Sequence, residues 1–291
     1  MIRLMTDKAA DITPEDAEKY QIEILPFIVN LGEESMLADV NFLPQMFYEK
    51  LRKTDAMPST SQMSPADVED VYRRLTENGD AVIHVTMSGN GSGIFNTSTM
   101  VARQLCEEEG LDITVIDSSM FSMAIGAVVI EGAKMAQAGL GKEEIISYMT
   151  SCFDRDTAYF LVDDLTFLKN GGRIKATTMA ISSILDIKPI LMINDGLVEA
   201  YKKVRGLKKA ISVLANYAVE RMECPEENEI ILLHSDAGDK VQILSAMLEE
   251  KVHPKKISVY EIGPIITAHA GLGLIGLYFR HQKPYGTYEK K

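Results

Sequence analysis

The sequence predicts an α/β protein with two domains. Short apolar, β-branched runs alternate with amphipathic stretches almost to the end of the chain, which is typical of a mostly parallel sheet covered by helices. Two helix starts carry a hydroxyl cap followed by proline, a proline being already fixed at a helical φ. The 291 residues also exceed the usual size of one compact core.

The first half, residues 1–156, is predicted to form a three-layer α/β/α domain. Its helices are expected to start at Thr13-Pro14 and at Ser64-Pro65. The expected strands are 2–5, 22–29, 81–86 and 113–117, and the further helices are 95–109, 123–138 and 142–152.

The second half, residues 157–291, is predicted to form an α/β domain with a mixed sheet. Asn194-Asp195-Gly196 indicates a tight turn between two extended runs, hence an antiparallel hairpin. The expected strands are 158–162, 189–193, 198–204, 229–234 and 257–262, and the expected helices are 210–222 and 240–250.

Composition excludes several functional classes. The net charge of -12 argues against nonspecific binding to nucleic acid, which needs a basic footprint. No segment resembles a secretion signal or reaches the roughly 18 apolar residues of a membrane span, so we expect a cytoplasmic protein. The three cysteines and five histidines lack metal-ligand spacing, and we expect neither a metal nor a cofactor.

A glycine-serine loop, residues 88–93, follows a predicted strand and precedes a predicted helix. Such a loop can direct backbone N–H groups and hydroxyls at an anion. It matches neither the P-loop nor the dinucleotide fingerprint, and Ser88 and Ser92 lack the flanking glycines of a nucleophile elbow. The loop therefore predicts an anion-binding site without an activated nucleophile.

Six short motifs extend this picture to a family resemblance. They are Thr6-Asp7-Lys8-Ala9-Ala10-Asp11, Pro58-Ser59-Thr60-Ser61-Gln62, Ser92-Gly93, Val115-Ile116-Asp117-Ser118, Asp163-Asp164-Leu165 with 168–174, and Gly263-Pro264 with Ala268-His269 and Gly271. In this order they resemble the DegV family over nearly the whole chain. The resemblance implies a carrier that binds a long-chain fatty acid between its domains and presents it to a separate fatty acid kinase subunit, and that is not itself an enzyme.

The resemblance also implies the ligand-binding residues. Thr60, Ser61, Ser92 and Gly93 are expected to hold the carboxylate, with His269 as a supporting donor. The family usually reads Ser-Gly-Leu-Ser-Gly-Thr in the loop, whereas this chain has one extra residue and Ile94 in place of the threonine. For Thr60 and Ser61, the alternative is an ordinary turn before the helix cap at Ser64. For His269, the alternative is a histidine whose hydrogen bonds are satisfied within the core.

The fatty acid tail is expected to supply most of the affinity, at roughly 0.8 kcal/mol for each buried methylene. Residues 160–168 and 179–192 are rich in Leu, Ile, Met and Phe, and we expect them to line the acyl chain. Ordinary domain core is the alternative for both segments.

A basic segment, residues 202–209, stands out in an acidic chain. Its lysines at the start of a predicted helix oppose the helix dipole, which favours a partner surface over a solvated face. With Arg173, which resembles a basic position of the family, we expect Lys203 and Arg205 to dock the kinase. Such a segment can also attract the protein transiently to anionic lipid headgroups.

Two other functions remain open at the level of sequence. One is a lipid sensor without a kinase partner. The other is a small-molecule phosphoryl-transfer subunit, because dihydroxyacetone kinase subunits are thought to share this fold.

Overall fold

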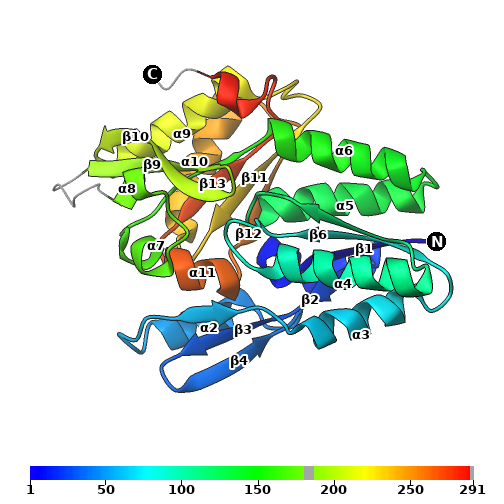
Figure 1. Ribbon diagram of the computed structural model, residues 1–291. Coiled ribbons are helices and arrows are strands. Elements are labelled where there is room, and N and C mark those ends of the chain that lie inside the picture. The colour runs from blue at the N-terminus through cyan, green and yellow to red at the C-terminus, as the bar shows by residue number, and fades with distance from the viewer. Residues whose placement is uncertain (180–186, 289–291) are drawn as a thin grey trace. The chain divides into compact units, whose positions relative to one another are not determined.

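The computed structural model describes residues 1–179 and 187–288 (Figure 1). The chain forms two compact units, Met1–Leu43 with Pro58–Phe153 and Pro44–Met57 with Asp154–Lys291. The main division between these units falls after Phe153. The sequence did not indicate that residues 44–57 join the second unit.

The first unit contains a four-stranded, fully parallel sheet in the order β2-β1-β6-β7. Its strands are β1 (Ile2–Asp7), β2 (Glu23–Leu25), β6 (Ala81–Thr86) and β7 (Ile113–Asp117). Helices cover both faces of the sheet, as Figure 1 shows. They are α1 (Pro14–Tyr20), α3 (Pro65–Thr76), α4 (Ile94–Glu109), α5 (Met123–Gln137) and α6 (Lys142–Arg155), with a 3-10 turn η1 (Lys8–Ala10) after β1. The predicted α/β/α layering is confirmed.

Both predicted helix starts are present. The Thr13 hydroxyl accepts a hydrogen bond from the Asp16 N–H, and Ser64 with Asp67 forms a reciprocal capping box. These caps satisfy N–H groups that the first helical turn would leave unpaired.

A second, three-stranded antiparallel sheet in the first unit was not predicted. Its order is β4-β3-β5, from β3 (Phe27–Leu31), β4 (Glu34–Ala38) and β5 (Ser59–Ser61). The expected single strand 22–29 is divided at Pro26, which has no N–H to donate to a neighbouring strand. β5 carries two of the predicted ligand-binding residues.

The second unit contains a six-stranded mixed sheet in the order β10-β9-β8-β13-β11-β12. Only β11 and β12 pair in parallel, and the predicted hairpin joins β9 and β10 through Asp195-Gly196. The strands are β8 (Ala158–Leu161), β9 (Ile187–Asn194), β10 (Leu197–Arg205), β11 (Glu229–His234), β12 (Lys256–Glu261) and β13 (Ile275–Tyr278). The predicted mixed α/β domain is confirmed.

Helices of two lengths surround this sheet. The long ones are α9 (Leu207–Arg221) and α10 (Gly238–Lys251). The short ones are α2 (Pro44–Leu51), α7 (Thr166–Gly171), α8 (Ala176–Met179), α11 (Pro264–Ala270) and the 3-10 turn η2 (Tyr285–Thr287). Helix α2 belongs here because its Tyr48 hydroxyl donates hydrogen bonds to the carbonyl oxygens of His234 and Ile262.

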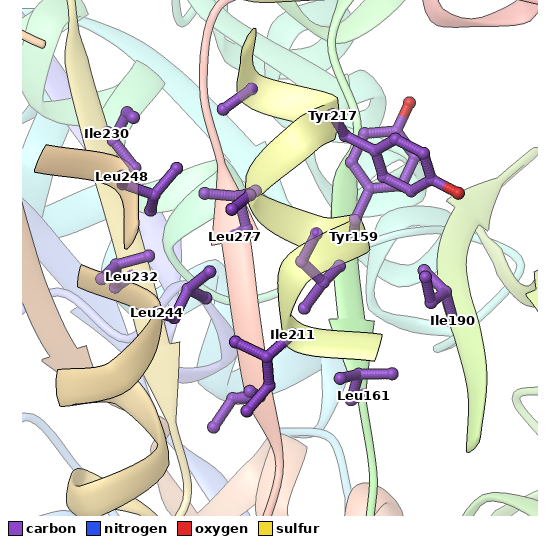
Figure 2. Close-up of a cluster of buried hydrophobic side chains, with 14 of the residues drawn as sticks. Tyr159, Leu161, Ile190, Ile211, Tyr217, Ile230, Leu232, Leu244, Leu248 and Leu277 are labelled. Atoms are coloured by element: carbon purple, nitrogen blue, oxygen red, sulfur yellow. The ribbon is translucent and has the colours of Figure 1, made fainter. Parts of the chain in front are cut away.

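The core of the second unit lies between the sheet and helices α9 and α10 (Figure 2). Tyr159, Leu161 and Ile190 pack there against Ile211 and Leu244. Because side chains alternate along a strand, the residues between them face the other side of the sheet. The sheet therefore has a second apolar face.

Candidate functional site

Strand β5 places the first two predicted ligand-binding residues. Thr60 is half-buried and lies opposite the buried Val29 of β3, whereas Ser61 is exposed and lies opposite Ile28. Successive side chains of a strand point to opposite faces, so the two hydroxyls do not converge. Thr60 is the better placed of the two for a partly enclosed ligand.

Gln62 connects β5 to the glycine loop. Its Nε2 donates a hydrogen bond of 2.7 Å to the Thr97 Oγ1 in α4. Its Oε1 lies 2.9 Å from the position that a Cβ atom on Gly93 would occupy. The structure thus brings the 60–62 segment together with Gly93, and a side chain at position 93 would require Gln62 to shift. Gln62 belongs to the Pro-Ser-Thr-Ser-Gln motif, but the sequence analysis did not select it.

The glycine loop uses its own backbone N–H groups differently from the sequence prediction. The Gly89 N–H donates to Asp117, the Gly91 and Ser92 N–H groups donate to the Ser88 carbonyl oxygen, and the Ile94 N–H donates to the Ser92 Oγ. These four N–H groups each have an acceptor within the protein, so they are not directed at an anion. The predicted anion contact of the loop then depends on the Ser92 hydroxyl and on Gly93.

Ser92 is half-buried and lies at the start of α4, where Gly93 is the exposed N-cap without a side-chain cap. The Ser92 Oγ is the acceptor for the Ile94 N–H at 3.3 Å. A hydroxyl has one hydrogen to donate besides its lone pairs. The Ser92 hydroxyl therefore can donate to a carboxylate while it caps the helix.

In the second unit, His269 lies on α11 and packs against α7. Its Nδ1 lies 2.6 Å from the position that a Cβ atom on Gly171 would occupy. Burial, helped by the nearby charge of Arg173, lowers the pKa of His269 to about 4. The ring is therefore neutral at physiological pH, with one N–H donor and one acceptor nitrogen.

Arg173 lies beside His269 and not beside the other two predicted partner-binding residues. Its guanidinium donates to the Gly171 carbonyl oxygen. Burial lowers the pKa of the guanidinium. The Arg173 backbone pairs with Val198 near the start of β10. Lys203 and Arg205 are five and seven residues further along this strand, about 17 and 23 Å away at roughly 3.3 Å per residue.

Lys203 and Arg205 are exposed on β10, an edge strand of the six-stranded sheet. The following helix α9 begins at Leu207 with no acidic residue in its first turn, and Lys208 and Lys209 lie exposed in that turn. The predicted position of these lysines at a helix start is confirmed. The basic segment is thus a surface feature that is separate from the Arg173 and His269 pair.

The two segments that were expected to line the acyl chain divide between the faces of the sheet. Leu161, Ile190 and Met192 belong to the core with α9 and α10. Phe160 and Leu191 pair on the opposite face, as expected from strand alternation. Gly276 of the neighbouring strand β13 pairs with Phe160 and adds no side chain beside it. Residues 180–186 lie outside the described residues.

The described residues show neither a metal-binding cluster nor a membrane-spanning helix. No group of three or more His, Cys, Asp or Glu side chains there could hold a metal ion. No helix in that part of the chain is both long and apolar enough to cross a membrane.

Comparisons with known proteins agree along the whole chain. Residues 1–282 match the family described as uncharacterised proteins of the DegV family. A DegV domain-containing protein of Caldanaerobacter subterraneus is 32% identical over 97% of this chain and 99% of its own length.

Two solved structures have the same fold. One, from Thermus thermophilus, is described for the fatty acid binding of a DegV family protein; it shares 28% identity at a TM-score of 0.84 and covers 95% of this chain and 98% of its own. The other, DegV from Bacillus subtilis, is described as a fatty acid binding protein; it shares 27% identity at a TM-score of 0.83, over 97% and 99% of the two chains. This chain belongs to the DegV family.

Proposed function

We propose that this protein binds one long-chain fatty acid in the cytoplasm and presents its carboxylate to a partner fatty acid kinase. The observation that carries the proposal is the contact of β5 with the glycine loop through Gln62. This contact gathers hydroxyl donors in a chain whose solved relatives are described as fatty acid binding.

The first unit holds the head group in this proposal. Thr60 and Ser92 donate to the carboxylate, and Gly93 and Gln62 set the distance between β5 and α4. Each hydrogen bond to a charged group contributes roughly 1.5 to 3 kcal/mol. Ser61 lies on the opposite face of β5, so its hydroxyl does not contact the carboxylate. Its backbone helps to position Thr60 by pairing with Ile28 of β3.

The second unit holds the acyl chain and the supporting donor. In this proposal the acyl chain packs on the sheet face of Phe160 and Leu191, and neutral His269 supports the head group without adding a fixed positive charge. A chain of about sixteen carbons offers on the order of 11 to 12 kcal/mol before the cost of association. The tail therefore supplies most of the affinity, and the head group determines the position and orientation of the fatty acid along the pocket.

Presentation to a kinase is the second half of the proposal. Neutral hydroxyl donors leave a carboxylate oxygen accessible for phosphorylation, whereas an arginine fork would hold both oxygens. The exposed charges of Lys203 and Arg205 provide a docking surface for an acidic partner. The chemistry belongs to the kinase.

Thr60→Val tests the head-group assignment, because it keeps the shape of the side chain and removes the hydroxyl. We expect the affinity of the delipidated protein for added long-chain fatty acid to fall by about 1 to 3 kcal/mol at an unchanged melting temperature. Thr99→Val, at an exposed position of α4, is the matched control and should bind like the parent. Equal affinities of the parent and Thr60→Val would contradict the assignment.

A further inference from the structure

A buried carboxylate holds the entrance of the glycine loop. Asp7 ends β1 and is fully buried. Its Oδ2 accepts a hydrogen bond of 2.7 Å from the Met87 N–H, and its Oδ1 accepts one of 3.0 Å from the Ala9 N–H. Met87 is the residue between β6 and the glycine loop, so Asp7 fixes the point at which the loop leaves the sheet.

A second carboxylate holds the same loop from the other side. Asp117 ends β7, and its Oδ1 accepts hydrogen bonds from the N–H groups of Gly89 and Ser119, at 3.0 and 2.8 Å. Strand β6 lies between β1 and β7 in the sheet. The carboxyl ends of parallel strands meet at one edge, so the loop after β6 is held by one carboxylate from each neighbouring strand.

The position of Ser92 follows from these two contacts. The Ser88 N–H donates to the Met120 carbonyl oxygen, and the Ser88 carbonyl oxygen accepts from the N–H groups of Gly91 and Ser92. Ser88, which follows Met87 directly in the chain, is therefore linked to Ser92 by a backbone hydrogen bond. A shift at Met87 is transmitted to the Ser92 hydroxyl.

We propose that Asp7 is a positioning residue of the head-group site, which holds Ser92 in its binding position through the Met87 N–H. The inference rests on the proposed fatty acid binding. Asp7 touches no ligand in this scheme. The ionised carboxylate accepts strongly from both N–H groups at once, whereas a protonated carboxyl keeps one strong acceptor oxygen and turns the other into a hydroxyl, which is a weaker acceptor. Binding should therefore weaken as Asp7 takes up a proton.

The surroundings of Asp7 bring its titration into the neutral pH range. Burial raises its pKa to about 7, while the Met87 and Ala9 N–H groups act in the opposite direction. The ionisable groups on the elements around Asp7 are Lys8 in η1, Asp11 directly after η1, Glu23 in β2, His84 in β6, Asp117 in β7, and Glu131 and Lys134 in α5. None of these contributes to the shift. His84 is neutral, because burial lowers its pKa to about 3.

Asp7→Asn imitates the protonated carboxyl and provides the test. Fatty acid affinity is measured for the parent and the variant at about pH 6 and about pH 8.5, on either side of the Asp7 pKa of about 7. At the higher pH we expect the variant to bind about tenfold more weakly or worse. At the lower pH the two proteins should converge. Ionisation of the fatty acid itself is common to both proteins and cancels in the comparison.

Asp80→Asn is the matched control. Asp80 is also buried, but it precedes β6, whereas the loop follows β6, and it pairs with Arg3. This variant should keep the parent's affinity at both pH values. An equal loss in both variants, or an Asp7→Asn affinity within about twofold of the parent at the higher pH, would overturn the inference. A parent that binds no fatty acid at either pH would instead refute the proposed function.

Hydrogen exchange keeps the inference testable if Asp7→Asn does not fold. In the parent, protection of residues 87–93, corrected for intrinsic rates, should fall relative to helix α5 between about pH 8.5 and about pH 6, as Asp7 takes up its proton. Constant relative protection of the loop would contradict the role of Asp7.

Discussion

The His269 ring is kept neutral by two separate causes. Burial against Gly171 is the larger one, and the charge of Arg173 is the smaller. A pKa lowered from 6.5 to about 4 means that the neutral ring stabilises the fold fully above about pH 6.5. This contribution is lost as the pH falls from 6.5 towards 4. The charge of Arg173 therefore helps to lower the pKa of His269, a residue of the proposed pocket.

Arg173→Ala should raise the pKa of His269, but not to 6.5, since the burial remains. The histidine ring signals in an NMR pH titration measure this change directly. Arg205→Ala is the control and should leave the His269 pKa unchanged, because Arg205 lies near the far end of β10. An unchanged pKa in Arg173→Ala would show that burial alone accounts for the shift.

Helices α7 and α11 are held together at two positions where a glycine meets a ring. His269 packs on Gly171, and Phe167 packs on Gly271, with ring atoms 2.6 and 2.8 Å from the positions of the missing Cβ atoms. A side chain at either position would separate the helices. This close packing sets the position of His269 relative to α7.

Gly171→Ala should destabilise the protein by about 1 to 3 kcal/mol, because the added methyl overlaps the His269 ring and its backbone neighbours cannot shift freely. Urea unfolding measures the free-energy change. Gly238→Ala, in the first turn of α10, is the matched control: no atom lies within 4 Å of its added methyl, and we expect neutral or slightly higher stability. Equal stability of Gly171→Ala and the parent would contradict the tight α7 to α11 contact.

Elements with strong local signals could be predicted from the sequence, and elements that depend on distant partners could not. Pro14 and Pro65 after their caps, and the Asp195-Gly196 turn, determine local backbone geometry and were placed correctly. Helix α2 joins the second unit through Tyr48, whose acceptors lie far away in sequence.

The same distinction applies to the site. Motifs select Thr60, Ser92 and His269 for the proposed site, but they do not reveal the bonds of Gln62 or Asp7 to segments far away in sequence. The alternation of Thr60 and Ser61 became evident only once β5 was assigned, because a strand of three residues carries no periodic signal of its own.

At the scale of the whole molecule, a basic surface contrasts with the acidic net charge. The chain carries a net charge of -12, yet the edge strand β10 and the start of α9 expose Lys203, Arg205, Lys208 and Lys209. Exposed charges contribute to association rates more than to stability. The acidic remainder of the surface repels a negatively charged kinase. The basic residues of β10 and α9 would attract that kinase to this part of the surface.

Replacing Lys203 and Arg205 together by alanine should leave fatty acid affinity unchanged and slow the phosphorylation of the bound lipid by a kinase of the same organism. In the parent this reaction should slow as salt rises, because exposed charges are screened over roughly 10 Å at 0.1 M. The matched control replaces Lys255 and Lys256, exposed at the opposite edge of the same sheet. Equal rates in the two double variants would contradict a docking role for β10.

The most direct test of the central claim is to identify what the purified protein carries. Denaturing extraction with organic solvent, followed by mass spectrometry and quantitation, should yield a long-chain fatty acid in a near-stoichiometric amount, because each methylene of the acyl chain that leaves water contributes roughly 0.8 kcal/mol to binding. An extract without fatty acid, together with no binding of added long-chain acids by the refolded protein, would contradict the account.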